Sequence, residues 1–130
     1  MKNFEEITYQ ITDEEKRIAE ILVQRFKEKP GKAKKVTNNQ IVSGLKKQYN
    51  IQTNGARIRK IINYIRNKGL LTGLIATSSG YWTTSDPEEL RSWLESMKQR
   101  EEAIRQTRLS GERDLMNLTL FNSVQDEEEL

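Results

Sequence analysis

The sequence predicts a mainly α-helical fold with one small β-hairpin. Two capping boxes, which start at Thr12 and Thr37, each open a segment whose apolar residues recur at helical spacing. Residues 53–71, TNGARIRKIINYIRNKGLL, continue this pattern with isoleucines at i, i+3, i+4 and i+7. Two runs rich in β-branched and aromatic residues then flank Ser78-Ser79-Gly80, which predicts strands joined by a turn.

The composition limits the classes of protein that the chain can belong to. Its 130 residues suit one domain and a tail, and 32% of them are charged. The chain has no Cys and no His, which removes disulfides and the commonest metal ligands, so we expect no metal and no cofactor. No apolar run approaches the roughly 20 residues that a membrane span needs. We expect a soluble, cytoplasmic protein without membrane contact.

The charges are distributed unevenly along the chain. No Asp or Glu occurs between Glu28 and Asp86, although this window contains many Lys and Arg residues. A basic surface without acids favours polyphosphate, because each neutralised phosphate releases counterions. The alternative, a basic surface kept for solubility, would more often mix both signs.

The first half of the chain is expected to form three helices after an N-terminal arm, residues 1–11. The first helix runs from 12 to about 27, and Pro30-Gly31 is the signal that terminates it. The second runs from Thr37 to Tyr49. The third is capped by Thr53 and closes at Gly69, which can take the left-handed conformation.

The third helix has an apolar face and a basic, amide-bearing face. Ala56, Lys60, Asn63 and Asn67 lie opposite the isoleucines at 100° per residue, and Arg57 and Tyr64 flank them. Arg and Lys can bind guanine and Asn can pair with adenine in a major groove. The groove-facing residues predicted on this basis are Arg57, Lys60, Asn63, Tyr64 and Asn67. An ordinary surface helix with solvated charges is the alternative.

Lysines elsewhere in the acid-free window are candidates for phosphate contacts. Those in the preceding helix are Lys46 and Lys47, and those in the loop KPGKAKK are Lys32, Lys34 and Lys35. For the loop, a solvated linker is the equally weighted alternative. Two helices joined by about three residues, the second basic, have the spacing of a helix-turn-helix.

The predicted order of three helices and a hairpin is that of a winged helix, a three-helix core plus wing. A long C-terminal helix, 86–110, follows, with Asp86 as its N-cap. Leu90, Trp93, Met97 and Ile104 have heptad-like spacing, interrupted by Arg100, which suggests a homodimer through a coiled coil. Ser110-Gly111 should break this helix, and residues 111–130 are expected to form a flexible acidic tail. The domain would then cover residues 12–110.

Residues 37–108 resemble the winged helix-turn-helix domains of small bacteriophage and prophage proteins. The resemblance lies in GARIRKIINYIRNKGLL and in GLIATSSGYWTTSDPEELRSWLESMKQREEAI. It implies binding of double-stranded DNA in phage replication or early gene control. The chain departs from many such wings at the tip, where Thr77, Ser78, Ser79 and Gly80 replace Lys or Arg.

The tail segment Asn117-Leu118-Thr119-Leu120-Phe121 resembles the peptide by which bacterial replication proteins dock on the DNA polymerase sliding clamp. The resemblance implies that Leu118, Leu120 and Phe121 enter apolar pockets of the clamp. Asn117 stands where a longer Gln is usual. The alternatives are that this segment packs on the domain, forms a short helix or binds another partner.

The sequence does not predict an enzyme, because its acids are explained as helix caps and first-turn residues, and no Gly-rich phosphate loop ends in Gly-Lys-Ser/Thr. A second hypothesis is a protein-interaction adaptor that uses the last helix and the tail to bind replication or transcription proteins. Salt-dependent duplex binding would separate the two hypotheses.

Overall fold

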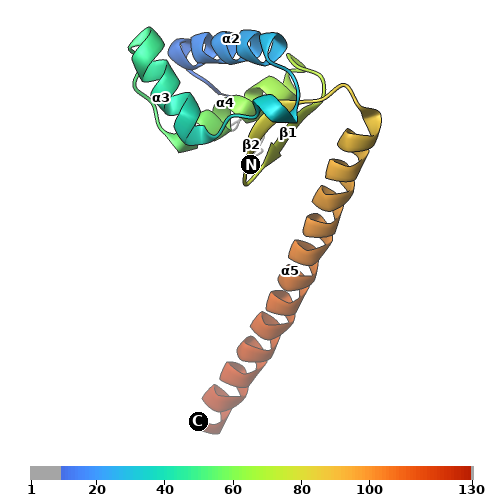
Figure 1. Ribbon diagram of the computed structural model, residues 1–130. Coiled ribbons are helices and arrows are strands. Elements are labelled where there is room, and N and C mark those ends of the chain that lie inside the picture. Colours follow the sequence, from blue (N-terminus) through green and yellow to red (C-terminus); the bar gives the residue numbers. More distant parts are fainter. Residues whose placement is uncertain (1–9, 130) are drawn as a thin grey trace. The chain divides into compact units, whose positions relative to one another are not determined.

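The computed structural model describes residues 10–129 of the chain, so most of the predicted arm, residues 1–9, lies outside the described residues. The described part contains four α-helices, one short 3₁₀ helix and a two-stranded antiparallel hairpin (Figure 1). The mainly helical prediction with a small hairpin is therefore confirmed. The chain divides after residue 90 into two compact units.

The first three helices begin where their side chains can satisfy free backbone N–H groups. α2 spans Asp13–Glu28 and α3 spans Asn38–Tyr49, and the predicted capping boxes at Thr12 and Thr37 are both formed. α4 spans Gly55–Asn67, but its cap is Asn54, whose Oδ1 accepts from Arg57 N at 2.9 Å. The predicted cap at Thr53 was therefore wrong by one residue; Asn is as good an N-cap as Thr.

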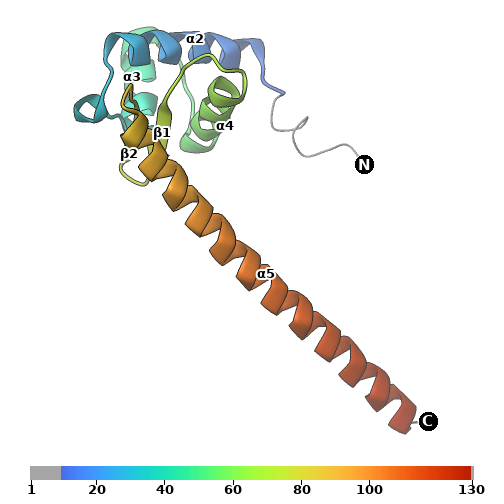
Figure 2. The same ribbon diagram turned by 90° about the vertical axis from the view of Figure 1, so that its right-hand side faces the viewer.

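α4 is the centre of the first unit. It packs against both α2 and α3, and its isoleucines are all buried, between 0% and 2% exposed. Phe26, Ile18 and Leu45 from the other two helices join the same core. Figures 1 and 2 show α4 beside α2 and α3. On the face of α4 opposite the buried isoleucines, Ala56, Asn63 and Asn67 are exposed.

The hairpin follows α4 and closes one side of the core. β1, Leu74–Thr77, pairs with β2, Gly80–Thr83, in the register Ile75 with Trp82. The sequence did not predict that Val36 also pairs with Tyr81, through N–H···O bonds of 3.0 and 2.8 Å. This bridge ties η1, the 3₁₀ helix Lys32–Lys34, to the sheet.

Gly73 and Gly80 make the hairpin geometry possible. Gly73 has φ +76°, and an added Cβ there would overlap the carbonyl oxygen of Thr84. Gly80 has φ +132°, and an added Cβ would come 2.8 Å from Val36 O. Both positions therefore require the absence of a side chain.

The second unit is helical throughout its described length. α5 spans Pro87–Glu129, so the predicted break at Ser110-Gly111 was wrong, and residues 111–129, expected to form a tail, continue the helix. One interior glycine costs a helix only about 1 kcal/mol, too little to end it. An ion pair of 2.7 Å between Arg108 Nη1 and Glu112 Oε1 spans Gly111 and supports the helix there.

Candidate nucleic-acid interface

The two sides of α4 that flank its buried isoleucines have different surroundings. One side faces the acidic first turn of α2. Glu15, only 2% exposed, accepts from Arg57 Nε at 3.4 Å and from Lys60 Nζ at 3.1 Å. Arg57 Nη2 also reaches Glu14 Oε1 at 3.4 Å. The side chains of Arg57 and Lys60 are accordingly only 35% and 36% exposed.

These ion pairs correct the expected orientation of Arg57 and Lys60. Helical periodicity placed Lys60 opposite the isoleucines, with Arg57 at the flank, but it could not show which neighbour would pack there. The carboxylate of Glu15 holds both cations against α2, so they brace the α2–α4 contact. Contact of Arg57 and Lys60 with DNA stays a prediction. Glu15 already compensates much of the positive charge that such a contact would use.

These contacts lower the pKa of Glu15. Burial by itself would raise the pKa of this carboxyl group. The backbone N–H of Thr12 and the side chains of Lys60 and Arg57 donate to it, and together they lower the pKa below its ordinary value. Glu15 is therefore ionised at neutral pH and both caps α2 and anchors α4.

Among the described residues, 10–129, the other side of α4 has no acidic ion-pair partner, and its side chains are exposed. Ala56, Arg59, Asn63 and Asn67 are all exposed and lie on one face at i, i+3, i+7 and i+11. Arg59 was not among the predicted site residues. Helical periodicity could have indicated it, because at 100° per residue Arg59 lies on the opposite flank of the helix from Arg57. Tyr64 is half-buried, and Asn63 Oδ1 accepts from Arg66 Nη1 at 3.3 Å.

The open face of α4 begins beside the first turn of α3. A Cβ at Gly55 would come 3.9 Å from Asn38 Cβ and 3.7 Å from Arg59 Nη1. The Asn38 carboxamide accepts from Tyr81 Oη at 2.9 Å, which links the α3 N-terminus to β2. The N-termini of α3 and α4, each with its partial positive charge, therefore lie together with Arg59.

The helices differ in how their N-termini are compensated. α2 and α5 place acids in their first turns, whereas the first turns of α3 and α4 contain none. Helix N-termini without acids attract anions such as phosphate. The two acid-free N-termini are those that meet at the open face.

The predicted phosphate-contacting lysines are all exposed but do not form one cluster. Lys46 and Lys47 lie in the last turn of α3, away from its N-terminus. Lys32, with Lys34 and Lys35, belongs to the η1 segment, and its ammonium lies 5.6 Å from the centre of the Trp82 ring. Arg25 Nη2 donates to Lys34 O at 2.8 Å. The KPGKAKK segment is thus fixed to the domain and is not a loose linker.

The hairpin tip presents hydroxyl groups. Thr77 and Ser79 are exposed, and Ser79 N donates to Thr77 Oγ1 at 3.1 Å. These hydroxyls are hydrogen-bond partners for phosphate oxygens, but they add no positive charge.

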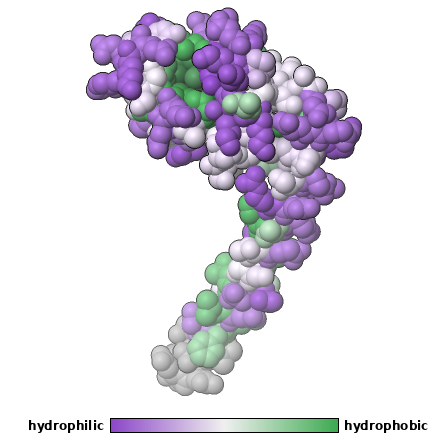
Figure 3. All heavy atoms as spheres, viewed as in Figure 1, coloured by the Kyte–Doolittle hydropathy of each residue, from purple (hydrophilic) through white to green (hydrophobic). Residues whose placement is uncertain are grey.

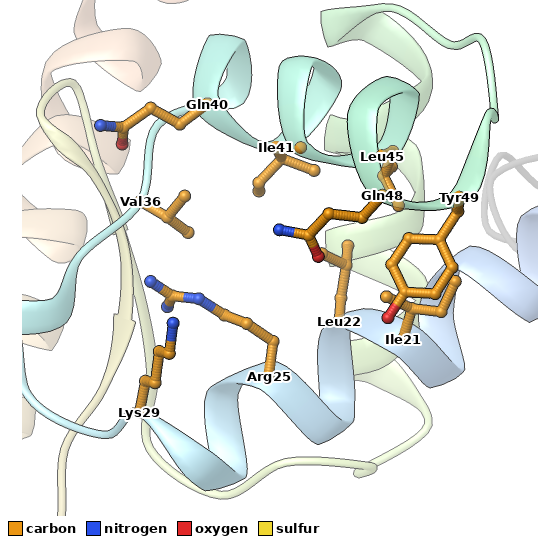
Figure 4. A pocket seen from close by; sticks show the side chains of 11 residues that line it. Ile21, Leu22, Arg25, Lys29, Val36, Gln40, Ile41, Leu45, Gln48 and Tyr49 are labelled. Atoms are coloured by element: carbon orange, nitrogen blue, oxygen red, sulfur yellow. The ribbon is translucent and has the colours of Figure 1, made fainter.

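A separate hollow of about 170 Å³ lies between α2 and α3. Figure 3 shows apolar side chains at its floor, and Figure 4 shows Arg25, Lys29 and Gln48 directed into it from its rim. Burial lowers the pKa of Arg25, whose Nη1 has no hydrogen-bond partner among the described residues. The hollow is on the α2 side of the core and does not include the open face of α4.

The residues that resemble a clamp-binding peptide lie on α5. Leu118, Leu120 and Phe121 are 61%, 59% and 58% exposed. These three residues are helical, as part of α5.

The described residues contain no group of three or more potential metal-ligating side chains. Among the same residues, no helix combines the length and apolar character that crossing a membrane requires. Searches against family models, curated proteins and solved structures gave no match to this chain.

Proposed function

We propose that this chain is a DNA-binding protein of the winged-helix type, in which the open face of α4 enters the major groove. The open face is defined as Ala56, Arg59, Asn63 and Asn67. The observation that carries the proposal is that this face bears a cation and two amides, has no acid, and begins where two acid-free helix N-termini meet.

The chemistry of the open face matches the edges of base pairs. Arg59 can donate to O6 and N7 of guanine, and Asn63 and Asn67 can each make two hydrogen bonds with adenine. Ala56 carries no bulk, which allows the first turn of α4 to approach the base edges. The N-termini of α3 and α4 would take the flanking phosphates.

Most of the remaining predicted residues would contribute positive charge to the proposed DNA interface. Lys46, Lys47, Lys32, Lys34 and Lys35 are exposed and would neutralise phosphates outside the groove. Arg57 and Lys60 would act mainly by fixing α4 on α2. The hairpin would lie along the backbone as a wing whose hydroxyls make weak contacts.

The resemblance to phage and prophage proteins supports a role in phage DNA replication or early gene regulation. Both roles begin with binding of double-stranded DNA. The proposal therefore concerns duplex binding first, and the regulatory context second.

An electrophoretic shift assay of the full chain with random-sequence duplex at two salt concentrations tests the proposal. Binding should weaken steeply with salt, because counterions are released from the DNA. Arg59→Ala with Asn63→Ala should weaken it by about tenfold or more. Arg113→Ala with Asn117→Ala makes the same changes on the exposed surface of α5 and should have little effect. Equal binding by both double variants would contradict the proposal.

A second candidate function is a protein-interaction adaptor, which the exposure of Leu118, Leu120 and Phe121 favours. We propose the bacterial sliding clamp as the partner to test first, with the last turns of α5 unwinding to dock. Leu120→Ala with Phe121→Ala should abolish capture by immobilised clamp and leave the DNA shift unchanged. Unchanged capture would exclude the clamp as a partner of this segment.

A further inference from the structure

α5 exposes a continuous stripe along one face. We define the stripe as residues separated alternately by three and four positions: Leu94, Met97, Glu101, Ile104, Arg108, Gly111, Leu115 and Leu118. Its five apolar members are between 41% and 70% exposed. This spacing is that of the core positions of a coiled coil. A helix gains most of its stability in proteins by packing such a face, so an exposed helix of 43 residues needs a partner.

The geometry points to antiparallel pairing of α5 with α5 of a second copy of this chain. The stripe is apolar at both ends and carries Glu101, Arg108 and Gly111 in its middle. In an antiparallel pair with Leu94 level with the partner's Leu118, Met97 is level with the partner's Leu115. The apolar ends then cover each other twice.

The middle of the stripe distinguishes the two orientations. In a parallel pair in register, Glu101 would face the partner's Glu101 and Arg108 would face the partner's Arg108, which places like charges in the interface. In the antiparallel pair, Glu101 lies level with the partner's Gly111. The missing side chain of that glycine leaves room for Glu101 to reach the partner's Arg108, one layer away.

The residues beside the stripe favour the same orientation. Lys98 would lie against the partner's Glu112, and Arg100 against the partner's Asp114. Each of these contacts occurs twice by symmetry, and every one joins opposite charges. Trp93 would lie against the partner's Phe121. In the parallel pair, Arg100 would instead approach the partner's Arg105.

The surface of α5 already has the shape that such pairing needs. Met97, Arg100, Glu101 and Ile104, at i, i+3, i+4 and i+7, border a shallow, open depression; four residues at this spacing form the hole that receives a side chain from a facing helix in a coiled coil. A second depression lies beside Ile104, Thr107 and Arg108.

Three features oppose the pairing or fall outside it. In this register Ile104 lies level with the partner's Arg108, so a charged side chain meets an apolar one in the two central layers. At the two-fold axis Arg105 would approach the partner's Arg105; its own helix offsets this with Glu102, whose Oε1 lies 3.4 Å from Arg105 Nη1. Met116 and Leu120 lie on the outer side of the pair, so the pairing does not explain them. Because the first unit is joined to the start of α5, the pair would carry its two DNA-binding units at opposite ends.

Disulfide trapping tests the orientation, because the chain contains no Cys of its own. Leu94→Cys alone should give no cross-linked dimer under mild oxidation. An equimolar mixture of Leu94→Cys and Leu118→Cys chains should give the mixed disulfide. Within one helix these positions are about 36 Å apart, so the cross-link can form only between copies. Efficient disulfide formation by Leu94→Cys alone would overturn the proposal in favour of a parallel pair.

Sedimentation equilibrium of the full chain tests the pairing itself and does not depend on DNA binding. The chain should dimerise, and Met97→Asp, at a position level with the partner's Leu115, should raise the dissociation constant by about 100-fold or more, because two charges would enter the apolar ends of the interface. Gln99→Asp, on the outer face, should leave it nearly unchanged.

Charge complementation provides a test that does not depend on the apolar positions. Lys98→Glu with Arg100→Glu should weaken self-association, and mixing with chains that carry Glu112→Lys and Asp114→Lys should restore it. A chain that stays monomeric at all concentrations, or a mixture that does not recover, would overturn the proposal.

Discussion

The two flanks of α4 both carry basic residues, but these residues have different surroundings. On one flank, Arg57 and Lys60 are held by Glu15 and Glu14, and about a third of each side chain is exposed. On the other, Arg59 has no acidic neighbour among the described ion pairs and lies beside the N-termini of α3 and α4. The difference is that the acids of α2 compensate Arg57 and Lys60, whereas none of the described ion pairs includes Arg59.

The largest expected effect is on stability, at the flank that faces α2. Glu15→Ala removes an acceptor for Thr12 N and leaves Arg57 and Lys60 half-buried without their shared partner. The free energy of unfolding should fall by about 2 kcal/mol, less than for a fully buried pair because both cations keep some contact with water. Urea unfolding followed by circular dichroism measures this.

Glu14→Ala is the matched control for this prediction. Its side chain is 55% exposed, and exposed ion pairs contribute about 0–1 kcal/mol. If both variants lost the same stability, Glu15 would not be the residue that anchors α4.

The second effect is on DNA affinity, at the open flank. Arg59→Ala should weaken duplex binding by about tenfold, the effect of removing one well-formed pair of hydrogen bonds to a base. Lys60→Ala, its neighbour with the same formal charge, should change affinity by less than about threefold because Glu15 already compensates it. Titration by fluorescence anisotropy at fixed salt compares them, and a larger effect for Lys60 would reverse the assignment of the two flanks.

The third effect is a dependence of stability on pH that belongs to the α2 flank. The pKa of Glu15 is lowered from its ordinary 4.5 in the folded protein, so the unfolded chain binds this proton more tightly. The stabilisation is complete above the ordinary value and is lost as the pH falls through the lower, folded value. Thermal unfolding midpoints of the native chain and of Glu15→Gln should therefore converge in acid, whereas parallel curves would show that Glu15 is not responsible.

The smallest effect on overall affinity is expected at Asn63. Asn63→Ala removes no charge, so binding to random duplex should change by less than about twofold. Discrimination at one base pair should fall by about 1 kcal/mol, because an amide reads base edges and does not neutralise phosphates. Selection from a randomised duplex pool, before and after the substitution, measures this. A uniform loss of affinity across all sequences would instead place Asn63 on the backbone.

Local signals in the sequence determined most of the fold of the first unit. Thr12 and Thr37 begin their helices because each is followed three residues later by a side chain that completes a capping box. The four isoleucines of α4 are buried because they share one face at helical spacing. The glycine and serine residues around 78–80 predicted the turn of the hairpin.

Local signals failed where several weak preferences had to be weighed against one another. Gly111 was expected to end α5, but its cost is small beside that of interrupting a long run of good helix formers. The bridge between Val36 and Tyr81 joins segments 45 positions apart in sequence, and no local sequence pattern predicts such a pairing.

The sequence by itself thus determined which residues of α4 face the core and that its remaining faces are basic. Only the tertiary structure decided which of those cations stay available, because this depends on the acids of α2, which lie more than 40 positions away along the chain. Helical periodicity fixes the angle of each side chain about its own axis. The neighbour that packs at that angle is set by how the helices meet, and here it neutralises Arg57 and Lys60 and leaves Arg59 open.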